Sequence, residues 1–404
     1  MSRVILGDIA ISQTGPFGSQ LHEEDYVSEG TPIVTVEHLG DINFTHQNLP
    51  FVSEADTKRL SKYILIEGDI VFSRVGSIDR NVYVDKNHEG WMFSGRCIRV
   101  RADKNKVNTR YLSYYFKQNS FKKMMMNLAV GATMPSLNTK IMNSIELDLL
   151  PRENQDKIAN ILSAIDDKIQ INNQINQELE AMVKTLYDYW FVQFDFPDQN
   201  GKPYKSSGGK MVYNPELKRE IPEGWGVEKL GNITICHDSK RVPLSSNDRE
   251  LVKGKIPYYG ATGIMDYVND YIFDGDYVLM AEDGSVMTEK GTPILQRISG
   301  KNWVNNHAHV LEPVKNHSCK LIMMLLKDVS VMKIKTGSIQ MKINQENMNK
   351  IVVPAIPLGL LFEINQKLEV IDKQQLNLIE ENKQLTQLRD WLLPMLMNGQ
   401  VKVE

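Results

Sequence analysis

Side chains that carry catalytic chemistry are scattered along these 404 residues. Asp198, followed by Glu216 and Lys218, has the residue types of a metal-dependent nuclease, but all three fall in a stretch rich in turn residues. Nuclease carboxylates must be held rigidly to share a metal ion, so we do not expect a nuclease there. His307 and His309 would lie on one side of a strand, where surface or core roles are more common than a site. The sequence offers no catalytic constellation.

Cofactor and metal motifs are absent as well. The sequence contains no GxxxxGK[ST] phosphate loop, no Asn-Pro-Pro-aromatic tetrapeptide and no CxxC pair among Cys97, Cys236 and Cys319. We therefore expect a chain without cofactor or metal, in a reducing cytoplasm. No apolar run approaches the ~20 residues that a membrane-spanning helix needs, and the N-terminus lacks a signal peptide. These absences favour a protein that binds over one that catalyses.

Positive charge is concentrated in two stretches, although the whole chain has a net charge of −3. Residues 96–145 contain ten lysines and arginines against one aspartate, and residues 313–345 contain six lysines against one aspartate. Lysine and arginine neutralise phosphates and supply much of the affinity of a protein for DNA. A solvated helix face is the usual alternative for a charge run. Because the pattern occurs twice, we favour DNA binding.

The candidate DNA-binding residues lie in these stretches and in polar or aromatic loops near them. Such loops could read base edges, although any one residue could equally be structural. The candidates are Arg74, Ser77, Arg80, Lys122, Lys123, Thr133, Ser136, Lys140, Tyr258, Tyr259, Thr262, Ser285, Lys335, Ser338 and Lys342.

The chain repeats itself. A shift of 206 positions aligns a long ungapped stretch, and with gaps the match extends upstream through Trp91 and Trp303 to Leu6 and Leu230. The coinciding pairs include Gly131 and Gly337, Asn138 and Asn344, Pro151 and Pro357, Ile158 and Ile364, and Leu179 and Leu385. Each half therefore consists of a β-rich module with some helix, a glycine loop, a proline and a long helix.

Each long helix carries a seven-residue apolar repeat, which is typical of a coiled-coil seam. The seam positions are Ile158, Ile165, Asn172, Leu179 and Leu186 in the first helix, and Ile371, Leu378, Leu385 and Leu392 in the second. A heptad seam has two lines of positions. In the first helix we expect the second line three residues after the first, at Ile161, Lys168, Ile175, Met182 and Tyr189. Two such helices in one chain most simply pair with each other, while packing of each helix on its own module is the alternative. The polar Asn172 would fix the register at a cost in stability.

These observations predict an α+β fold in which two mixed modules are separated by two long helices that form an antiparallel coiled coil, with a pseudo-twofold repeat. The predicted divisions are a first module at 1–150, a first helix at 151–192, a linker at 193–220, a second module at 221–357 and a second helix at 358–404.

In this order of elements the chain resembles the specificity subunit of type I restriction–modification enzymes. The resemblance rests on Ile221-Pro222-Glu223-Gly224-Trp225, on the Gly68-Asp69 and Gly275-Asp276 strands, on the glycine loops at Gly131 and Gly337, and on a proline before each long helix. The chain departs from the pattern at its start, where no Pro-Glu-Gly-Trp precedes the first module, and at Leu358-Gly359, where the first helix has Arg152-Glu153.

The resemblance implies two target recognition domains, each reading one half of a bipartite, asymmetric site in double-stranded DNA. It implies that the paired conserved helices measure the spacer and dock two modification subunits, which bring S-adenosylmethionine and methylate adenine. Restriction subunits would bring ATP, with Mg²⁺, for translocation and cleavage. A stand-alone regulator or architectural DNA-binding protein is the alternative function, and a free-standing nuclease built on Asp198 and Glu216 is the third.

Overall fold

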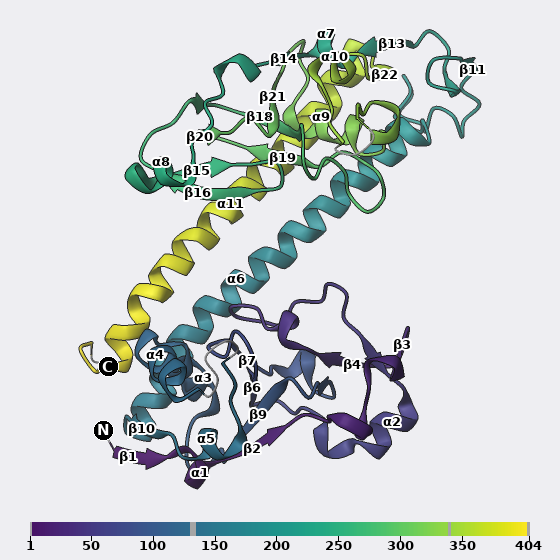
Figure 1. Ribbon diagram of the computed structural model, residues 1–404. Coiled ribbons are helices and arrows are strands. Elements are labelled where there is room, and N and C mark those ends of the chain that lie inside the picture. The colour runs from purple at the N-terminus through teal and green to yellow at the C-terminus, as the bar shows by residue number, and fades with distance from the viewer. Residues whose placement is uncertain (1, 130–134, 338–340, 402–404) are drawn as a thin grey trace. The chain divides into compact units, whose positions relative to one another are not determined.

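The computed structural model describes residues 2–129, 135–337 and 341–401. The chain forms two compact units, of which the first contains residues 1–173 and 380–404 and the second contains residues 174–379. Both division points lie inside the long helices α6 (Arg152–Tyr187) and α11 (Leu358–Met397), drawn in teal and yellow in Figure 1. Each unit therefore contains one β-rich module and a part of both helices, whereas the sequence-based divisions separate modules from helices.

The first unit contains two four-stranded sheets, with strand orders β2-β9-β6-β7 and β3-β5-β4-β8, and the pair β1-β10. Its strands are β1 Ser2–Ile5, β2 Ala10–Thr14, β3 Tyr26–Val27, β4 Thr31–Val34, β5 Phe51–Val52, β6 Asp69–Ser73, β7 Asn81–Tyr83, β8 Met92–Phe93, β9 Cys97–Ala102 and β10 Glu146–Leu149. Its helices besides α6 and α11 are α1 Leu6–Ile9, α2 Glu54–Arg59, α3 Thr109–Lys117, α4 Asn119–Leu128 and α5 Thr139–Asn143. Strand β6 is buried along its whole length, as expected for the centre of a covered sheet.

The second unit repeats this plan, with strand orders β14-β21-β18-β19 and β16-β15-β20-β17, and the pairs β13-β22 and β11-β12. Its strands are β11 Met211–Asn214, β12 Arg219–Pro222, β13 Gly226–Lys229, β14 Thr234–Cys236, β15 Lys253–Tyr259, β16 Ile264–Val268, β17 Phe273–Asp274, β18 Tyr277–Ala281, β19 Leu295–Ile298, β20 Lys301–Val304, β21 Ala308–Pro313 and β22 Val352–Ala355. Its shorter helices are α7 Leu230–Ile233, α8 Ser246–Leu251, α9 Cys319–Leu326 and α10 Gln345–Asn349.

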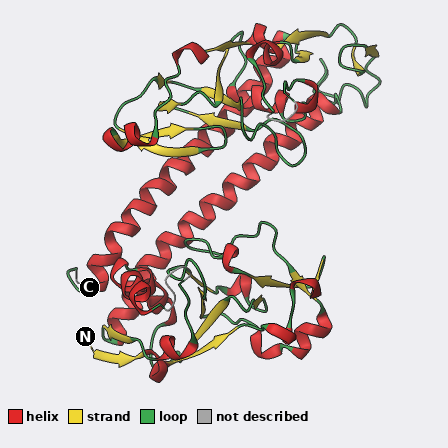
Figure 2. Cartoon of the chain, viewed as in Figure 1, coloured by secondary structure: helices red, strands yellow, loops and turns green. Residues whose placement is uncertain are grey.

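Short 3₁₀ turns and one π-helical turn complete the two units. They are η1 Gly18–Gln20, η2 Glu23–Asp25, η3 Val36–His38, η4 Ser61–Tyr63, η5 Lys86–His88, η6 Asp188–Val192, η7 Asp238–Lys240 and η8 Val331–Lys333, of which η6 is the π-helical turn. Figure 2 shows helices and strands in both units. The predicted α+β class and the repeat are confirmed.

Residues that coincide in the sequence repeat have the same structural role. Asn138 and Asn344 each cap the N-terminus of a short helix, because their side-chain oxygens accept a backbone N–H three residues on, at 2.9 and 2.7 Å. Pro151 and Pro357 directly precede α6 and α11, and their carbonyl oxygens accept the first backbone hydrogen bonds of those helices. The repeat therefore marks the points where helices begin.

The long helices pair in an antiparallel sense. In the first unit, the Arg389 guanidinium donates to Asp166 at 3.2 Å, and Asn172 donates to Asn382 at 2.9 Å. In the second unit, the Gln375 amide donates to the Glu180 carboxylate at 3.3 Å. The predicted antiparallel coiled coil is therefore confirmed. No helix among the described residues combines the length and the apolar character that crossing a membrane requires.

The seam differs from the predicted one in its second line of residues. Of the predicted positions, Ile158, Asn172 and Leu179 are buried, and Ile165, Leu186, Ile371, Leu378, Leu385 and Leu392 are half-buried. The expected second line is wrong at Met182 and Tyr189, which are exposed. The line that is buried instead follows four residues after the first and includes Leu162, Ile169 and Val183. A straight helix has 3.6 residues per turn, so neighbours three and four residues away compete for the seam.

The segment predicted as a linker, 193–220, packs into the second unit. Phe194 and Phe196 are buried, and the Phe196 ring stacks on Trp225 and on Tyr204, with ring centroids 5.3 and 4.9 Å apart. Its remaining residues include β11, which pairs with β12. The turn residues were read correctly as turns, but the aromatic residues between them anchor the segment to the core.

Candidate DNA-reading grooves

One loop recurs in both modules and brings predicted residues to equivalent places. It follows the central strand, β6 or β18, and has a glycine with φ of +73° at Gly76 or +74° at Gly284, followed by Ser77 or Ser285. Such a positive φ favours glycine. The residue before each glycine forms an isolated bridge, Val75 with Ser136 and Asp283 with Lys342. Two equivalent pairs of candidates therefore lie at the two copies of this loop: Ser77 with Ser136, and Ser285 with Lys342.

A groove of about 710 Å³ lies beside this loop in the first unit and is rich in arginine. Arg74, Arg80 and Arg96 line it, and Arg74 donates to the carbonyl oxygen of Gly95 at 3.1 Å. Within the described ranges, none of these three guanidiniums forms an ion pair with a carboxylate. Glu23 and Glu37 contribute negative charge to the same lining. We call this lining groove 1. Its guanidiniums can bind phosphate or the acceptor edge of guanine.

The equivalent place in the second unit is a smaller groove of about 380 Å³, which we call groove 2. It brings together the predicted Thr262 and Ser285 with Asp283 and His307. Asp283 accepts a hydrogen bond from His307 Nδ1 at 2.5 Å. This lining combines hydroxyls, one carboxylate and an imidazole, whereas the lining of groove 1 has three guanidiniums beside its carboxylates, so the two grooves differ chemically. The carboxylate of groove 2 suits the amino group of cytosine.

The structure removes Tyr258 from the candidates and limits the charge that Lys342 can offer to DNA. Tyr258 is only 1% exposed, and its hydroxyl accepts a hydrogen bond from the backbone N–H of Leu244 at 3.0 Å. Its assignment as a DNA contact is therefore corrected, because alternation along β15 turns this side chain into the core. The neighbouring Tyr259 is half-buried. Lys342 forms an ion pair with Glu282 at 2.9 Å, so its charge is partly used inside the protein.

The lysines of α4 line a different part of the first unit. Lys122 lies in a cavity of about 370 Å³ with Asp41, Asp166 and Asp390, whereas Lys123 is exposed. Among the other predictions, Lys140 is exposed and Lys335 is half-buried, while Thr133 and Ser338 lie outside the described residues.

The charge count overstated the basic surface of the first module. Arg101 pairs with the buried Asp69 at 2.7 Å, and Arg110 stacks on the Tyr83 ring with its guanidinium carbon 4.5 Å from the centroid. The sequence analysis counted Arg96 among the basic residues without naming it as a candidate, and it assigned His307 a surface or core role. The glycine that directly precedes Ser77 and Ser285 was the sequence signal that could have pointed to Arg96 and His307, because it marks the same loop in both modules.

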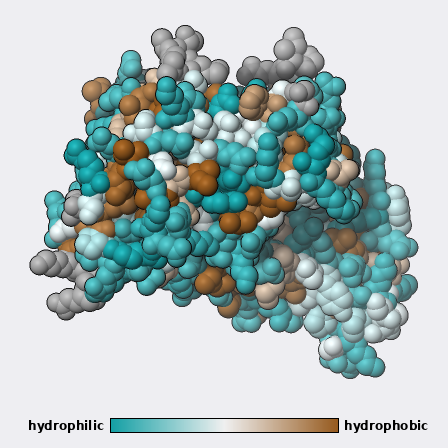
Figure 3. Space-filling view, turned by 90° about the horizontal axis from the view of Figure 1, so that it is seen from below, coloured by the Kyte–Doolittle hydropathy of each residue, from teal (hydrophilic) through white to brown (hydrophobic). Residues whose placement is uncertain are grey.

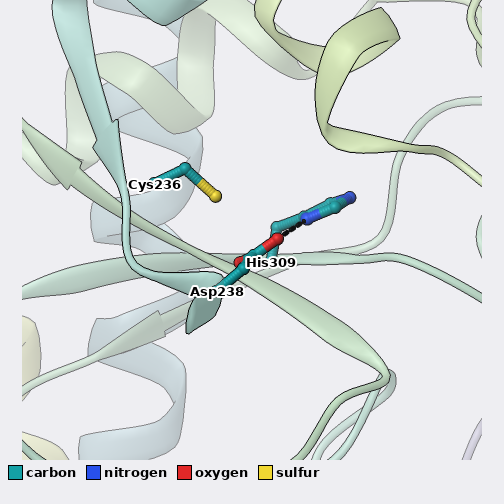
Figure 4. Close-up of side chains that lie close together, drawn as sticks. All are labelled: Cys236, Asp238 and His309. Atoms are coloured by element: carbon teal, nitrogen blue, oxygen red, sulfur yellow. Dashed lines mark hydrogen bonds and ion pairs between the residues drawn. The ribbon is translucent and has the colours of Figure 1, made fainter. Parts of the chain in front are cut away.

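A buried ion-pair network supports groove 2. Figure 4 shows Cys236 and Asp238 near His309, whose Nδ1 lies 2.5 Å from an Asp238 oxygen. His309 Nε2 donates to a backbone carbonyl at 2.8 Å, and Arg241 pairs with Asp238 at 3.3 Å and with Glu282 at 2.7 Å. Arg241 also donates to the carbonyl oxygen of residue 308 at 2.7 Å. The network thus anchors the residues directly before Asp283 and directly after His307.

In this network, burial and the neighbouring charges shift the pKa of Asp238 in opposite directions. Burial alone would raise the pKa of Asp238, but the hydrogen bond and charge of His309 and the charge of Arg241 hold it below its usual value. Burial, with the nearby Asp238, raises the pKa of the Cys236 thiol to about 12. Cys236, Asp238 and His309 have metal-like spacing, within 4.8 Å of one another. Since both His309 nitrogens are engaged and a guanidinium adjoins the carboxylate, we interpret the group as an ion-pair network.

The two acidic residues of the nuclease alternative lie in separate turns, and the Asp198 carboxylate is used locally. Asp198 accepts the backbone N–H groups of Asn200 and Lys202, both at 2.8 Å, and so closes its own turn. Glu216 lies in the turn that Asn214 caps by accepting from its backbone N–H at 3.0 Å. This arrangement gives the nuclease alternative no support.

Apolar side chains are exposed on the outer faces of the long helices. In the first unit they include Ile171, Leu388 and Trp391, and in the second unit Val370 and Ile379. The exposed fraction is 57% for Trp391 and 69% for Val370. On the face of the molecule in Figure 3, hydrophobic residues form patches among hydrophilic ones. Exposed apolar residues on a helix are suited to contact with another protein.

Comparisons with known proteins agree with this arrangement. The family model described as "Type I restriction modification DNA specificity domain" matches residues 2–181 and 222–387. The specificity subunit of the MjaIX type I restriction enzyme from Methanocaldococcus jannaschii is 24% identical, over 94% of this chain and 89% of that protein. The HindI specificity subunit from Haemophilus influenzae is 23% identical, over 92% of this chain and 95% of that protein.

A solved structure shows the same fold. The S subunit of the type I restriction–modification system from M. genitalium superposes with a TM-score of 0.57 at 15% identity, covering 100% of this chain and 96% of that one. The match to the family model and to the curated specificity subunits confirms the resemblance seen in the sequence, and nothing in the comparisons supports a stand-alone regulator. With the specificity domain matched twice along its length, the chain belongs to the family of type I restriction–modification DNA specificity subunits.

Proposed function

We propose that this chain supplies the sequence specificity of a multisubunit restriction–modification complex by reading a bipartite, asymmetric site in double-stranded DNA. The observation that carries the proposal is the pair of equivalent loops with unlike linings. Groove 1 presents Arg74, Arg80 and Arg96, whereas groove 2 presents Thr262 and Ser285 beside a carboxylate and an imidazole. Equivalent backbones with different base-reading chemistry fit two different half-sites.

The exposed apolar residues of α6 and α11 support docking of partner proteins on the helices. We propose that two modification subunits bind there, bring S-adenosylmethionine and perform the methylation, and that restriction subunits add ATP- and Mg²⁺-dependent cleavage. In this assignment the chain has no catalytic role of its own. Its residues position the DNA, and the chemistry belongs to the partners.

Selection from a random pool of DNA duplexes tests the proposal. The chain, bound to the modification subunits encoded with it, should enrich a motif of two specified segments of different sequence, separated by unspecified base pairs. A single contiguous motif would contradict the two-module reading. A palindromic motif would contradict the inference drawn from the unlike grooves.

A further inference from the structure

Two histidines of the first module face each other through their Nε2 atoms. His46 and His88 have Nε2 atoms 3.2 Å apart and ring centroids 5.4 Å apart. His88 belongs to η5 and is buried, whereas His46 lies in the exposed loop between β4 and β5. Two lone pairs at this separation repel each other unless a proton or a cation lies between them.

The second nitrogen of His88 is already fixed. Its Nδ1 lies 2.5 Å from Asp85 Oδ1, and the same oxygen accepts the backbone N–H groups of Asn87 and His88 at 3.0 and 3.2 Å. A carboxylate in this position accepts the Nδ1 proton and leaves Nε2 with its lone pair. Metal-binding histidines are commonly oriented in this way, by a carboxylate on the far ring nitrogen.

His46 complements this arrangement. It is exposed, and its Nε2 is the ring nitrogen that faces His88. The third histidine of this region, His38, takes no part, because its Nδ1 accepts the backbone N–H of Thr35 at 3.1 Å and its Nε2 donates to the carbonyl oxygen of Gln47 at 3.2 Å. The site therefore has two nitrogen ligands and an open side toward solvent.

We propose that His46 and His88 bind one divalent transition-metal ion through their Nε2 atoms, with Asp85 as the orienting partner and water completing the coordination. Imidazole nitrogen suits Zn²⁺, Ni²⁺ and Cu²⁺. Two nitrogens at about 2.0–2.1 Å from a tetrahedral Zn²⁺ lie roughly 3.3 Å apart. The observed separation of 3.2 Å needs only a small turn of the exposed His46 ring.

The ion would join two separate segments of the first module. The loop that carries His46 also carries Asn48 and Pro50, which line groove 1. A metal bridge from His46 to η5 therefore restrains one wall of that groove. The ion's role is structural, and no reaction is assigned to it.

Titration of the full chain with Zn²⁺, followed by calorimetry, tests this site. We expect one ion per chain in excess of what the His46→Gln variant binds. His46 is exposed, so this variant should fold normally. Asp85→Asn should weaken the same binding by about 10- to 100-fold, because the orienting carboxylate is lost. His307→Gln is the matched control, since His307 is also an exposed histidine paired with an aspartate but has no second imidazole in its groove.

Tryptophan fluorescence provides a second readout. Trp91 lies beside both rings, with centroids 5.3 Å from His46 and 4.6 Å from His88. Cu²⁺ bound at the site should quench Trp91, so wild type should lose more emission than either His46→Gln or Trp91→Phe. If His46→Gln matches wild type in Zn²⁺ stoichiometry and in Cu²⁺ quenching, the site does not exist. If His307→Gln removes the ion, the site has been placed in the wrong module.

Discussion

Asn172 and Asn382 meet inside the helix pair of the first unit, where Asn172 Nδ2 donates to Asn382 Oδ1 at 2.9 Å and to Glu381 at 2.8 Å. Asn172 is fully buried, and among the described residues its own Oδ1 has no hydrogen-bond partner. A polar residue at a seam position lowers stability but penalises every register in which it lacks its partners. The pair therefore fixes how far α6 and α11 slide against each other.

Replacing Asn172 with leucine should raise the free energy of unfolding by about 1–2 kcal/mol, because a buried acceptor without a partner costs about that much. Urea unfolding of the full chain measures the change. Asn160→Leu is the control and should change little, because Asn160 is exposed on the same helix and its side chain takes no part in the Asn172–Asn382 contact. A less stable Asn172→Leu variant would show that the two hydrogen bonds outweigh the cost of burial.

In groove 1, the double variant Arg80→Ala, Arg96→Ala should weaken specific DNA binding. Both guanidiniums are exposed, and neither forms an ion pair with a carboxylate in the described part of the chain, so their loss leaves no buried charge behind. A lost guanine contact costs about 1–3 kcal/mol and relaxes the preference at that base pair. Binding assays with each half-site scrambled in turn measure this. A loss confined to the half-site read by the second module would contradict the assignment of groove 1.

The α4 lysines give a different signature. Lys122→Ala with Lys123→Ala should weaken binding to all sequences alike and make the salt dependence shallower by about 0.9 log units per lost phosphate contact. Affinity measured between low and moderate salt gives this slope. An unchanged slope would mean that Lys123 faces solvent and that Lys122 contributes to the cavity that it lines together with Asp166.

The Asp238 network should make the second unit acid-sensitive. The pKa of Asp238 is below its usual value in the folded chain, so its stabilising contribution is complete above the unfolded pKa, near 4, and is lost as the pH falls through the lower folded value. Asp238→Asn should destabilise the second unit by roughly 3–5 kcal/mol near pH 7, because His309 and Arg241 lose their partner.

Urea unfolding of the wild type and the Asp238→Asn variant at pH 7 and pH 3 tests this prediction. The difference in free energy of unfolding between the two proteins should be smaller at pH 3 than at pH 7. An equal difference at both pH values would mean that the Asp238 carboxylate does not titrate as its surroundings indicate.

Much of the architecture followed from the sequence because its signals are local. The prolines before α6 and α11 and the capping Asn138 and Asn344 mark helix starts wherever they occur. The second line of buried seam residues could not be predicted from the sequence. Positions three and four residues after the first line are equally compatible with helical spacing, and only packing against the partner helix selects one of them.

The grooves were predictable only in part. Ser77 and Ser285 lie where their loops were expected to be, but Tyr258 is in the core because the phase of β15 cannot be read from a run of adjacent tyrosines. The Asp238 network joins Asp238 in η7, Glu282 directly after β18 and His309 in β21, so its members come from three separate parts of the sequence. Strand pairing, which local patterns do not reveal, brings them together.

Exchange of the second module tests the central claim most directly. Residues 221–357 would be replaced by the corresponding module of another specificity subunit, and the methylated motif would be mapped across the host genome with the cognate modification subunits present. We predict that one specified segment of the motif changes and the other is retained, because each module reads its own half-site. A motif in which both segments change, or neither does, would contradict the account.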